Sequence, residues 1–195
     1  MDHYQTISGS FQATIESIAM SVDEVAEPLS QASEMISAAL VQDRKILCCG
    51  EGTDAALATL FTSNLLGHAE RERPALPACC LTDSASLTAI STQYGPDEIF
   101  SRQVRALGQA GDILLCIDSA PTAGGSLQRA RQAATEAGLG VVSLTRHANN
   151  SAAEGVAIVV HSTSRHRVVE LHTMIIHCLC DLIEQNIFGP SEQET

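Results

Sequence analysis

Basic residues are scarce in this sequence. Lys and Arg together number 11 against 23 Asp and Glu, the formal net charge is −12, and Lys45 is the only lysine. A surface of this charge repels phosphate backbones and anionic lipid, so we expect no direct binding to nucleic acid or membrane. The charge would suit a basic protein partner, but an acidic surface that only keeps the protein soluble explains it better.

The sequence also lacks long apolar runs. No stretch reaches the length of a membrane span, and the first ten residues, MDHYQTISGS, have neither the basic region nor the apolar core of a secretory signal. The seven cysteines are odd in number and lie mostly within apolar runs, without paired CxxC motifs, so we expect buried, reduced thiols: Cys48, Cys49, Cys79, Cys80, Cys116, Cys178 and Cys180. These features predict a cytoplasmic protein.

With 195 residues, of which 45% are hydrophobic, the chain is long enough for one well-buried core. Helical spacing over residues 4–41 predicts two helices with a junction at Glu27–Pro28. Five short apolar runs predict buried strands, and the segments between them predict helices. The strands are expected at 45–50, 76–81, 112–117, 140–145 and 155–160, and the helices at 55–66, 85–92, 97–107, 126–137 and 165–187.

This alternation predicts a three-layer α/β/α fold, doubly wound around a parallel five-stranded sheet. We expect residues 1–44 to form a helical oligomerisation segment, 45–188 the α/β domain and 189–195 a disordered tail. The last helix is apolar over a wide arc, which fits either a deeply buried helix or a subunit contact, and we favour the second slightly. Ile175, Leu179 and Phe188 are the residues we expect at an interface or partner surface.

Two loops that follow predicted strands are candidate ligand sites. The first is GEGTDA at 50–55, and the second is DSAPTAGGS at 118–126. Ligands of open α/β sheets bind at such positions, and glycine, hydroxyls and free amides suit a phosphate. A Gly-rich turn is as often only a tight turn. The candidate ligand-binding residues are Glu51, Gly52, Thr53, Asp54, Asp118, Ser119, Thr122 and Ser126.

Four segments carry a resemblance to a known family: KILCCGEGTDAA, ERERPALPA, RQVRALGQAGDILLCI and ELHTMIIHCLCDLIEQNIF. They resemble the SIS-domain family, namely the phosphoheptose isomerases and their relative DiaA, which associates with the bacterial replication initiator DnaA. The resemblance implies a flavodoxin-like SIS domain and a homotetramer. It implies one of two functions, a metal-assisted isomerisation of sedoheptulose 7-phosphate or a non-catalytic association with DnaA.

Departures from the isomerase pattern favour the second function. The family's metal-binding His and catalytic Glu correspond here to Leu60 and Asn64, its Gln to Val169, and only His177 is kept. A phosphate-binding Ser of the family corresponds to Asp54, and the second loop begins with Asp118. Carboxylates repel a bound phosphate, and isomerisation needs a base. We therefore expect no catalytic residue, no metal and no cofactor.

The resulting expectation is a DiaA-like, non-enzymatic regulator whose homotetramer binds a DnaA-type replication initiator and promotes its assembly at the origin. The alternative is a phosphoheptose isomerase-like enzyme, or a sugar-phosphate sensor, with an altered pocket. Loss of a catalytic group does not by itself identify a new partner, so both remain open at this point.

Overall fold

The computed structural model describes residues 3–68, 71–122, 124–146 and 155–190. Its centre is a parallel sheet of five strands in the order β2-β1-β3-β4-β5. The strands are β1 (Ile46–Gly50), β2 (Ala78–Cys80), β3 (Ile113–Asp118), β4 (Gly140–Thr145) and β5 (Val156–Val159). All five lie within or near the predicted strand segments, and the predicted α/β fold is confirmed.

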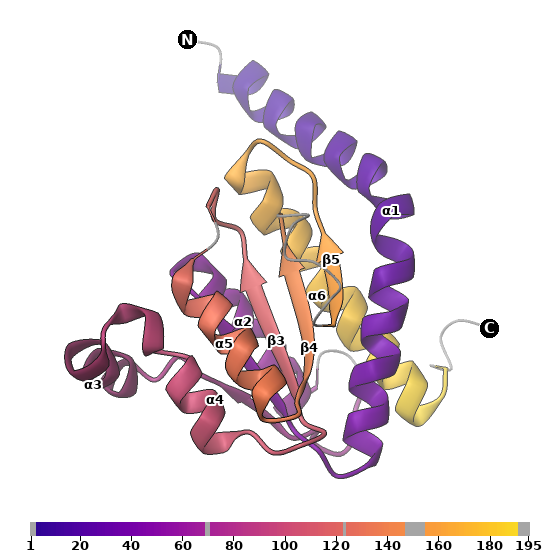
Figure 1. Cartoon of the computed structure of the whole chain (residues 1–195). Helices are drawn as coiled ribbons and strands as arrows, with labels where there is room; N and C mark the ends of the chain where they lie inside the picture. Colours follow the sequence, from indigo (N-terminus) through magenta and orange to yellow (C-terminus); the bar gives the residue numbers. More distant parts are fainter. Residues whose placement is uncertain (1–2, 69–70, 123, 147–154, 191–195) are drawn as a thin grey trace.

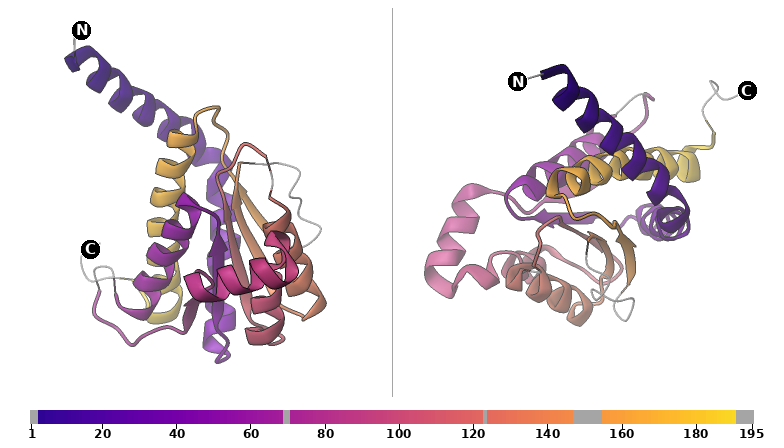
Figure 2. Two further views of the ribbon diagram at one scale, coloured as in Figure 1. Left: turned by 90° about the vertical axis from the view of Figure 1, so that its left-hand side faces the viewer. Right: turned by 90° about the horizontal axis from the view of Figure 1, so that it is seen from above.

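The helices cover both faces of the sheet (Figures 1 and 2). They are α1 (His3–Val41), α2 (Thr53–Leu66), α3 (Ser84–Tyr94), α4 (Ser101–Leu107), α5 (Gly125–Glu136) and α6 (Arg165–Phe188), with a short 3-10 helix at Pro96–Glu98. Helices α1, α2 and α6 lie on one face, and α4 and α5 lie on the other. The predicted tail falls mainly on 191–195, outside the described residues.

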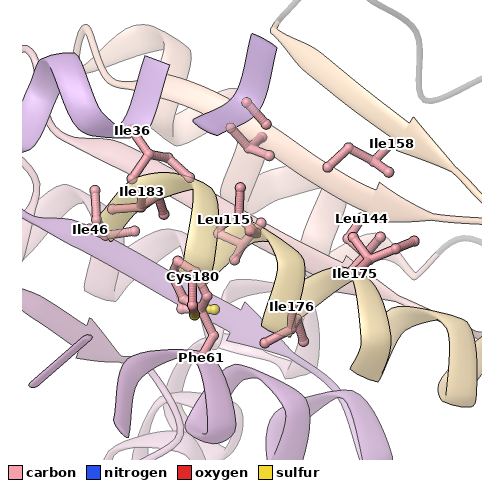
Figure 3. Packing of buried hydrophobic residues seen from close by; sticks show 14 of the residues in the cluster. Ile36, Ile46, Phe61, Leu115, Leu144, Ile158, Ile175, Ile176, Cys180 and Ile183 are labelled. Carbon is pink, nitrogen blue, oxygen red and sulfur yellow. The ribbon is translucent and has the colours of Figure 1, made fainter. Parts of the chain in front are cut away.

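The core follows the two-residue period of the strands. Ile46 and Cys48 of β1 point to the face covered by α1, α2 and α6, whereas Leu47 and Cys49 point to the opposite face. Figure 3 shows the larger cluster, in which Ile175, Ile176 and Ile183 of α6 pack with residues of the sheet and of α2. Helices cover both faces, so the strands are apolar over most of their length, and the buried polar exceptions are Asp118 of β3 and Ser143 and Thr145 of β4.

Two helices were predicted over residues 4–41, but the structure has the single helix α1, with Pro28 inside it. Proline lacks the N–H that would bond to the carbonyl four residues earlier, and it bends a helix without necessarily ending it. Figure 1 shows that α1 changes direction along its length. Val25 and Leu29 on either side of Pro28 are buried in the core, so packing keeps the helix continuous across the bend.

The strand order also locates the place where a ligand would bind. The chain leaves β1 toward β2 on one side, and it leaves β3 toward β4 on the other. Adjacent strands whose connections diverge in this way leave a crevice at their carboxyl ends, where open α/β sheets bind ligands. The two loops that follow β1 and β3 are the two that the sequence singled out.

Candidate functional site

The loop after β1 and the loop after β3 are joined by Asp54 and Ser119. Ser119 donates two hydrogen bonds to Asp54 Oδ2, from its backbone N–H at 2.8 Å and from its hydroxyl at 3.0 Å. Asp54 lies in the first turn of α2 and is only 2% exposed, and Ser119 follows β3 directly. The structure therefore brings together residues 65 positions apart that were both predicted to line the site.

Only one of the two oxygens of the Asp54 carboxyl accepts hydrogen bonds from the described residues. Its Oδ1 atom is buried and has no hydrogen-bond partner among the described residues. Burial raises the pKa of Asp54, against the lowering effect of the Ser119 hydrogen bonds and of the positive charge of Arg165; the charge of Glu51 raises it further. A carboxyl with an unpaired oxygen and a raised pKa is suited to exchange protons with a ligand.

The side chain of Glu51 reaches from the loop after β1 to the start of α5. Its Oε1 accepts a hydrogen bond from the Ser126 hydroxyl, and a Cβ placed on Gly124 would lie 3.4 Å from its Oε2. A Cβ on Gly125 would lie 2.7 Å from Asp97 Oδ1. The N-terminus of α5, which attracts anions, is thus approached by two carboxylates of the same chain.

The remaining predicted ligand-binding residues differ in exposure. Asp118 is 2% exposed, and its Oδ1 accepts a hydrogen bond from the Ala120 N–H at 3.1 Å. Thr53 and Thr122 are exposed. Gly52 is also exposed and adopts a φ of 58°, a backbone conformation that other residues rarely adopt. The two loops thus combine two buried carboxylates, of Asp54 and Asp118, with the exposed hydroxyls of Thr53 and Thr122.

The positions that correspond to the family's metal and catalytic residues have a different environment. Leu60 and Val169 are half-buried and pack against the apolar core, and Asn64 hydrogen-bonds Cys180, whose pKa burial raises to about 12. His177 is exposed on α6. Two aliphatic side chains and an amide held by a thiol do not fit the metal site that the resemblance implies. Over the described ranges, no three His, Cys, Asp or Glu side chains are placed to share a metal ion.

The residues expected at an interface or partner surface lie in two environments. Ile175 and Leu179 are each 1% exposed and belong to the core of their own chain. Phe188 is half-buried at the end of α6, where the Arg71 guanidinium lies 5.9 Å from its ring and donates to its carbonyl. Within a single chain, Ile175 and Leu179 are already covered.

Sequence reasoning did not place Asp97 at the site. It lies in the 3-10 helix Pro96–Glu98, far from the ligand loops in sequence, and only the packing of that helix against α5 brings its carboxylate to Gly125. No local pattern signals such a contact. The structure also contains, in the part it describes, no helix that is both long and apolar enough to cross a membrane.

Comparisons with known proteins give the chain's relationships. Residues 10–146 match the SIS domain family. The phosphoheptose isomerase of Halorhodospira halophila is 43% identical over 97% of this chain and 98% of its own length, and that of Chromohalobacter salexigens is 42% identical over 98% and 100%. The solved phosphoheptose isomerase of Francisella tularensis superposes with a TM-score of 0.87 at 33% identity, covering 95% of this chain and 100% of that one.

These relationships correct the main functional expectation. A non-enzymatic regulator that binds the initiator DnaA was expected, but relatives 39–43% identical over nearly the whole chain are named as an enzyme, phosphoheptose isomerase. The expectation was wrong because it equated missing family groups at Leu60, Asn64 and Val169 with a missing site. The loops retain Glu51, Asp54 and Asp118, which are groups capable of acid–base chemistry. The chain belongs to the SIS domain family and is a homologue of the phosphoheptose isomerases.

Proposed function

We propose that this protein is a phosphosugar isomerase that interconverts the ketose and aldose forms of a phosphorylated seven-carbon sugar, with sedoheptulose 7-phosphate as the ketose. The observation that carries the proposal is the identity of 43%, over almost the whole chain, to a relative named phosphoheptose isomerase. The proposal is also supported by the loops at the carboxyl ends of β1 and β3, because open α/β sheets bind their ligands at such a position.

The reaction needs groups that move protons. A base removes the proton from the carbon next to the carbonyl and returns it to the neighbouring carbon, while protons exchange between the two oxygens. Asn64 cannot act as this base because an amide does not take up a proton near neutral pH. We assign the role to Asp54, whose Oδ1 is unpaired among the described residues and whose carboxyl has a pKa raised by burial.

Two hydrogen bonds from Ser119 to Oδ2 fix the orientation of the Asp54 carboxyl, and we assign the proton transfer to Oδ1, which is buried and has no partner among the described residues. A base held in this way keeps its geometry through the reaction. No step is assigned to Leu60, Val169 or His177. The prediction that the family's catalytic and metal positions carry no function in this chain remains to be tested by their substitution.

The direct test is turnover of sedoheptulose 7-phosphate by the purified protein and by Asp54→Asn. The amide can still accept the Ser119 hydrogen bonds but cannot take a proton, so a rate loss of about a hundredfold or more is expected. Asp23→Asn makes the same chemical change at an exposed position of α1 and should keep the wild-type rate. Absence of wild-type turnover would reject the isomerase, and full activity of Asp54→Asn would reject Asp54 as the base.

A second candidate is a sugar-phosphate sensor that binds without turnover. The packing of Leu60 and Val169 against the core favours it, because neither side chain can bind a metal or a proton. The same assay separates the two candidates: a sensor would bind the sugar phosphate in calorimetry and leave it unchanged.

We also propose that the protein acts as a homotetramer. The first half of α1 extends beyond the body of the molecule (Figure 1) and carries exposed apolar residues on one face: Tyr4, Ile7, Phe11 and Ile15. Helical spacing places them on the same face as Val25 and Leu29, which are buried in the core. An apolar face that continues past the end of its own core is suited to a second copy of the chain.

A further inference from the structure

The loop after β3 resembles an anion-binding site in its donors, but four of its described donors already bind carboxylates of the same chain. The Ser119 N–H and hydroxyl donate to Asp54, the Ala120 N–H donates to Asp118, and the Ser126 hydroxyl donates to Glu51. Backbone amides and hydroxyls after a strand, followed by a helix N-terminus, are the groups that usually bind a phosphate. In this structure three carboxylates, Asp54, Asp118 and Glu51, accept from four of these donors.

The three carboxylates differ in how easily each could move away from the donors that it binds. Asp54 and Asp118 are each 2% exposed, whereas Glu51 is exposed to solvent. Glu51 also precedes Gly52, whose φ of 58° makes a sharp turn before α2. An exposed side chain can swing into water at little cost, but a buried carboxylate cannot move without opening the core. Glu51 is therefore the one carboxylate that a ligand could readily replace.

The position that Glu51 occupies suits a phosphate. Helix α5 has 12 residues, and its N-cap residue Gly124 supplies no side-chain cap for the first amides of the helix. The Glu51 carboxylate lies against Gly124 and the Ser126 hydroxyl, where the helix dipole stabilises negative charge. A phosphate oxygen placed there would accept the same hydrogen bond from Ser126.

We propose that Glu51 is an internal anion that occupies the phosphate-binding position of this site, and that the phosphate of the substrate binds by displacing it. The proposal rests on the proposed function in that it takes the ligand to be a phosphorylated sugar. It makes Glu51 a specificity-determining residue, because the phosphate must compete with a carboxylate already in place. Weak anions are excluded, and the apparent affinity is the intrinsic affinity multiplied by the fraction of molecules in which Glu51 has left the position.

A second, independent observation concerns Asp54, which belongs to the same pair of loops. The buried Asp54 Oδ1 has no partner among the described residues, and a buried polar oxygen without a partner is costly. A sugar hydroxyl could donate to that oxygen while the phosphate binds at the start of α5. Departure of Glu51 would also remove a negative charge that acts on Asp54.

The test compares binding of inorganic phosphate and of sedoheptulose 7-phosphate by calorimetry in the wild-type protein, Glu51→Gln and Glu51→Ala. Both variants remove the competing charge, so their dissociation constants for both ligands should fall about tenfold or more. Glu136→Gln removes the same charge at the other end of α5 and should bind as the wild type does. Thermal denaturation establishes that each variant is folded.

The position of the bound phosphate is tested by Ser126→Ala in the Glu51→Gln background. Loss of the Ser126 hydroxyl should reverse most of the gain in affinity. Equal affinities of wild type, Glu51→Gln and Glu51→Ala would overturn the proposal, as would a gain that survives Ser126→Ala. A gain in phosphate affinity without any turnover would reject the isomerase and support the internal anion. Turnover with an unchanged KM in Glu51→Gln would reject the internal anion alone.

Discussion

Arg73 and Glu184 form an ion pair inside the protein: Arg73 Nε donates to Glu184 Oε1 at 2.8 Å, and their side chains are 1% and 9% exposed. The other guanidinium nitrogens of Arg73 donate to carbonyls around the end of α2, including those of Asn64 and Leu65. These carbonyls have no partner within the helix, so Arg73 caps α2 and ties it to α6.

Glu184→Ala should lower the free energy of unfolding by about 3 kcal/mol, because it leaves the Arg73 charge buried without its partner. Chemical denaturation at neutral pH measures the change. The matched control is Glu136→Ala, which removes the more exposed of the two partners of Arg105, at 4.0 Å, and should change stability by less than about 1 kcal/mol. Equal losses in the two variants would show that burial of the Arg73 pair is unimportant.

His172 should make stability depend on pH. The side chain is fully buried, both ring nitrogens lack hydrogen-bond partners in the described part of the chain, and burial lowers its pKa from 6.5 to about 3. Above pH 6.5 the ring is neutral in both states. As the pH falls, the unfolded chain takes up the proton and the folded protein does not, so stability decreases until the pH reaches about 3.

Between pH 7 and pH 5 this effect should cost the wild-type protein about 2 kcal/mol. Urea denaturation of His172→Leu over the same range should show a loss smaller by about that amount, since leucine has no proton to bind. If wild type and variant lose stability equally, His172 does not account for the pH dependence.

Gly50 is required by the close approach of β1 to the start of α2. A Cβ on Gly50 would lie 2.6 Å from the backbone oxygen of Asp54 and 2.8 Å from its Cβ, so Gly50→Ala must displace the candidate base. We expect a loss of about 2 kcal/mol in stability together with a loss of sugar-phosphate turnover.

The opposite effect is expected at Gly9, where a Cβ would have no heavy atom within 4 Å. Gly9→Ala on exposed α1 should raise stability by about 0.5–1 kcal/mol, because alanine favours the helix. Thermal denaturation and the isomerase assay on both variants measure these differences. A harmless Gly50→Ala would contradict the close packing at the site.

The proposed homotetramer should depend on the exposed apolar face of α1. Phe11 is 70% exposed, and Phe11→Glu should dissociate the assembly without unfolding the chain, because within one chain the residue has little to pack against. Light scattering gives the mass, and circular dichroism reports on the fold. Gln5→Glu adds the same charge at an exposed position elsewhere on the helix and should leave the mass unchanged. A monomeric wild type would reject the assembly.

The fold class follows from local patterns in the sequence. Apolar runs such as ILCCG and ILLCID can be buried on both faces only in a parallel sheet covered by helices on both sides, and the strands are found where the runs are. The sequence also predicted two candidate ligand loops, because glycine and polar residues follow two of the buried strands. Such signals are local, and local signals can be read without a structure.

How those loops combine depends on the packing of the whole chain. That Asp54 binds Ser119, that Glu51 occupies the start of α5 and that Asp97 reaches Gly125 depend on strand order and helix packing, which bring together residues far apart in the chain. The same is true of Pro28, which was expected to end a helix and is instead held inside α1 by the burial of its neighbours Val25 and Leu29. Contact energies between distant residues outweigh local preferences, and the sequence around one residue does not contain them.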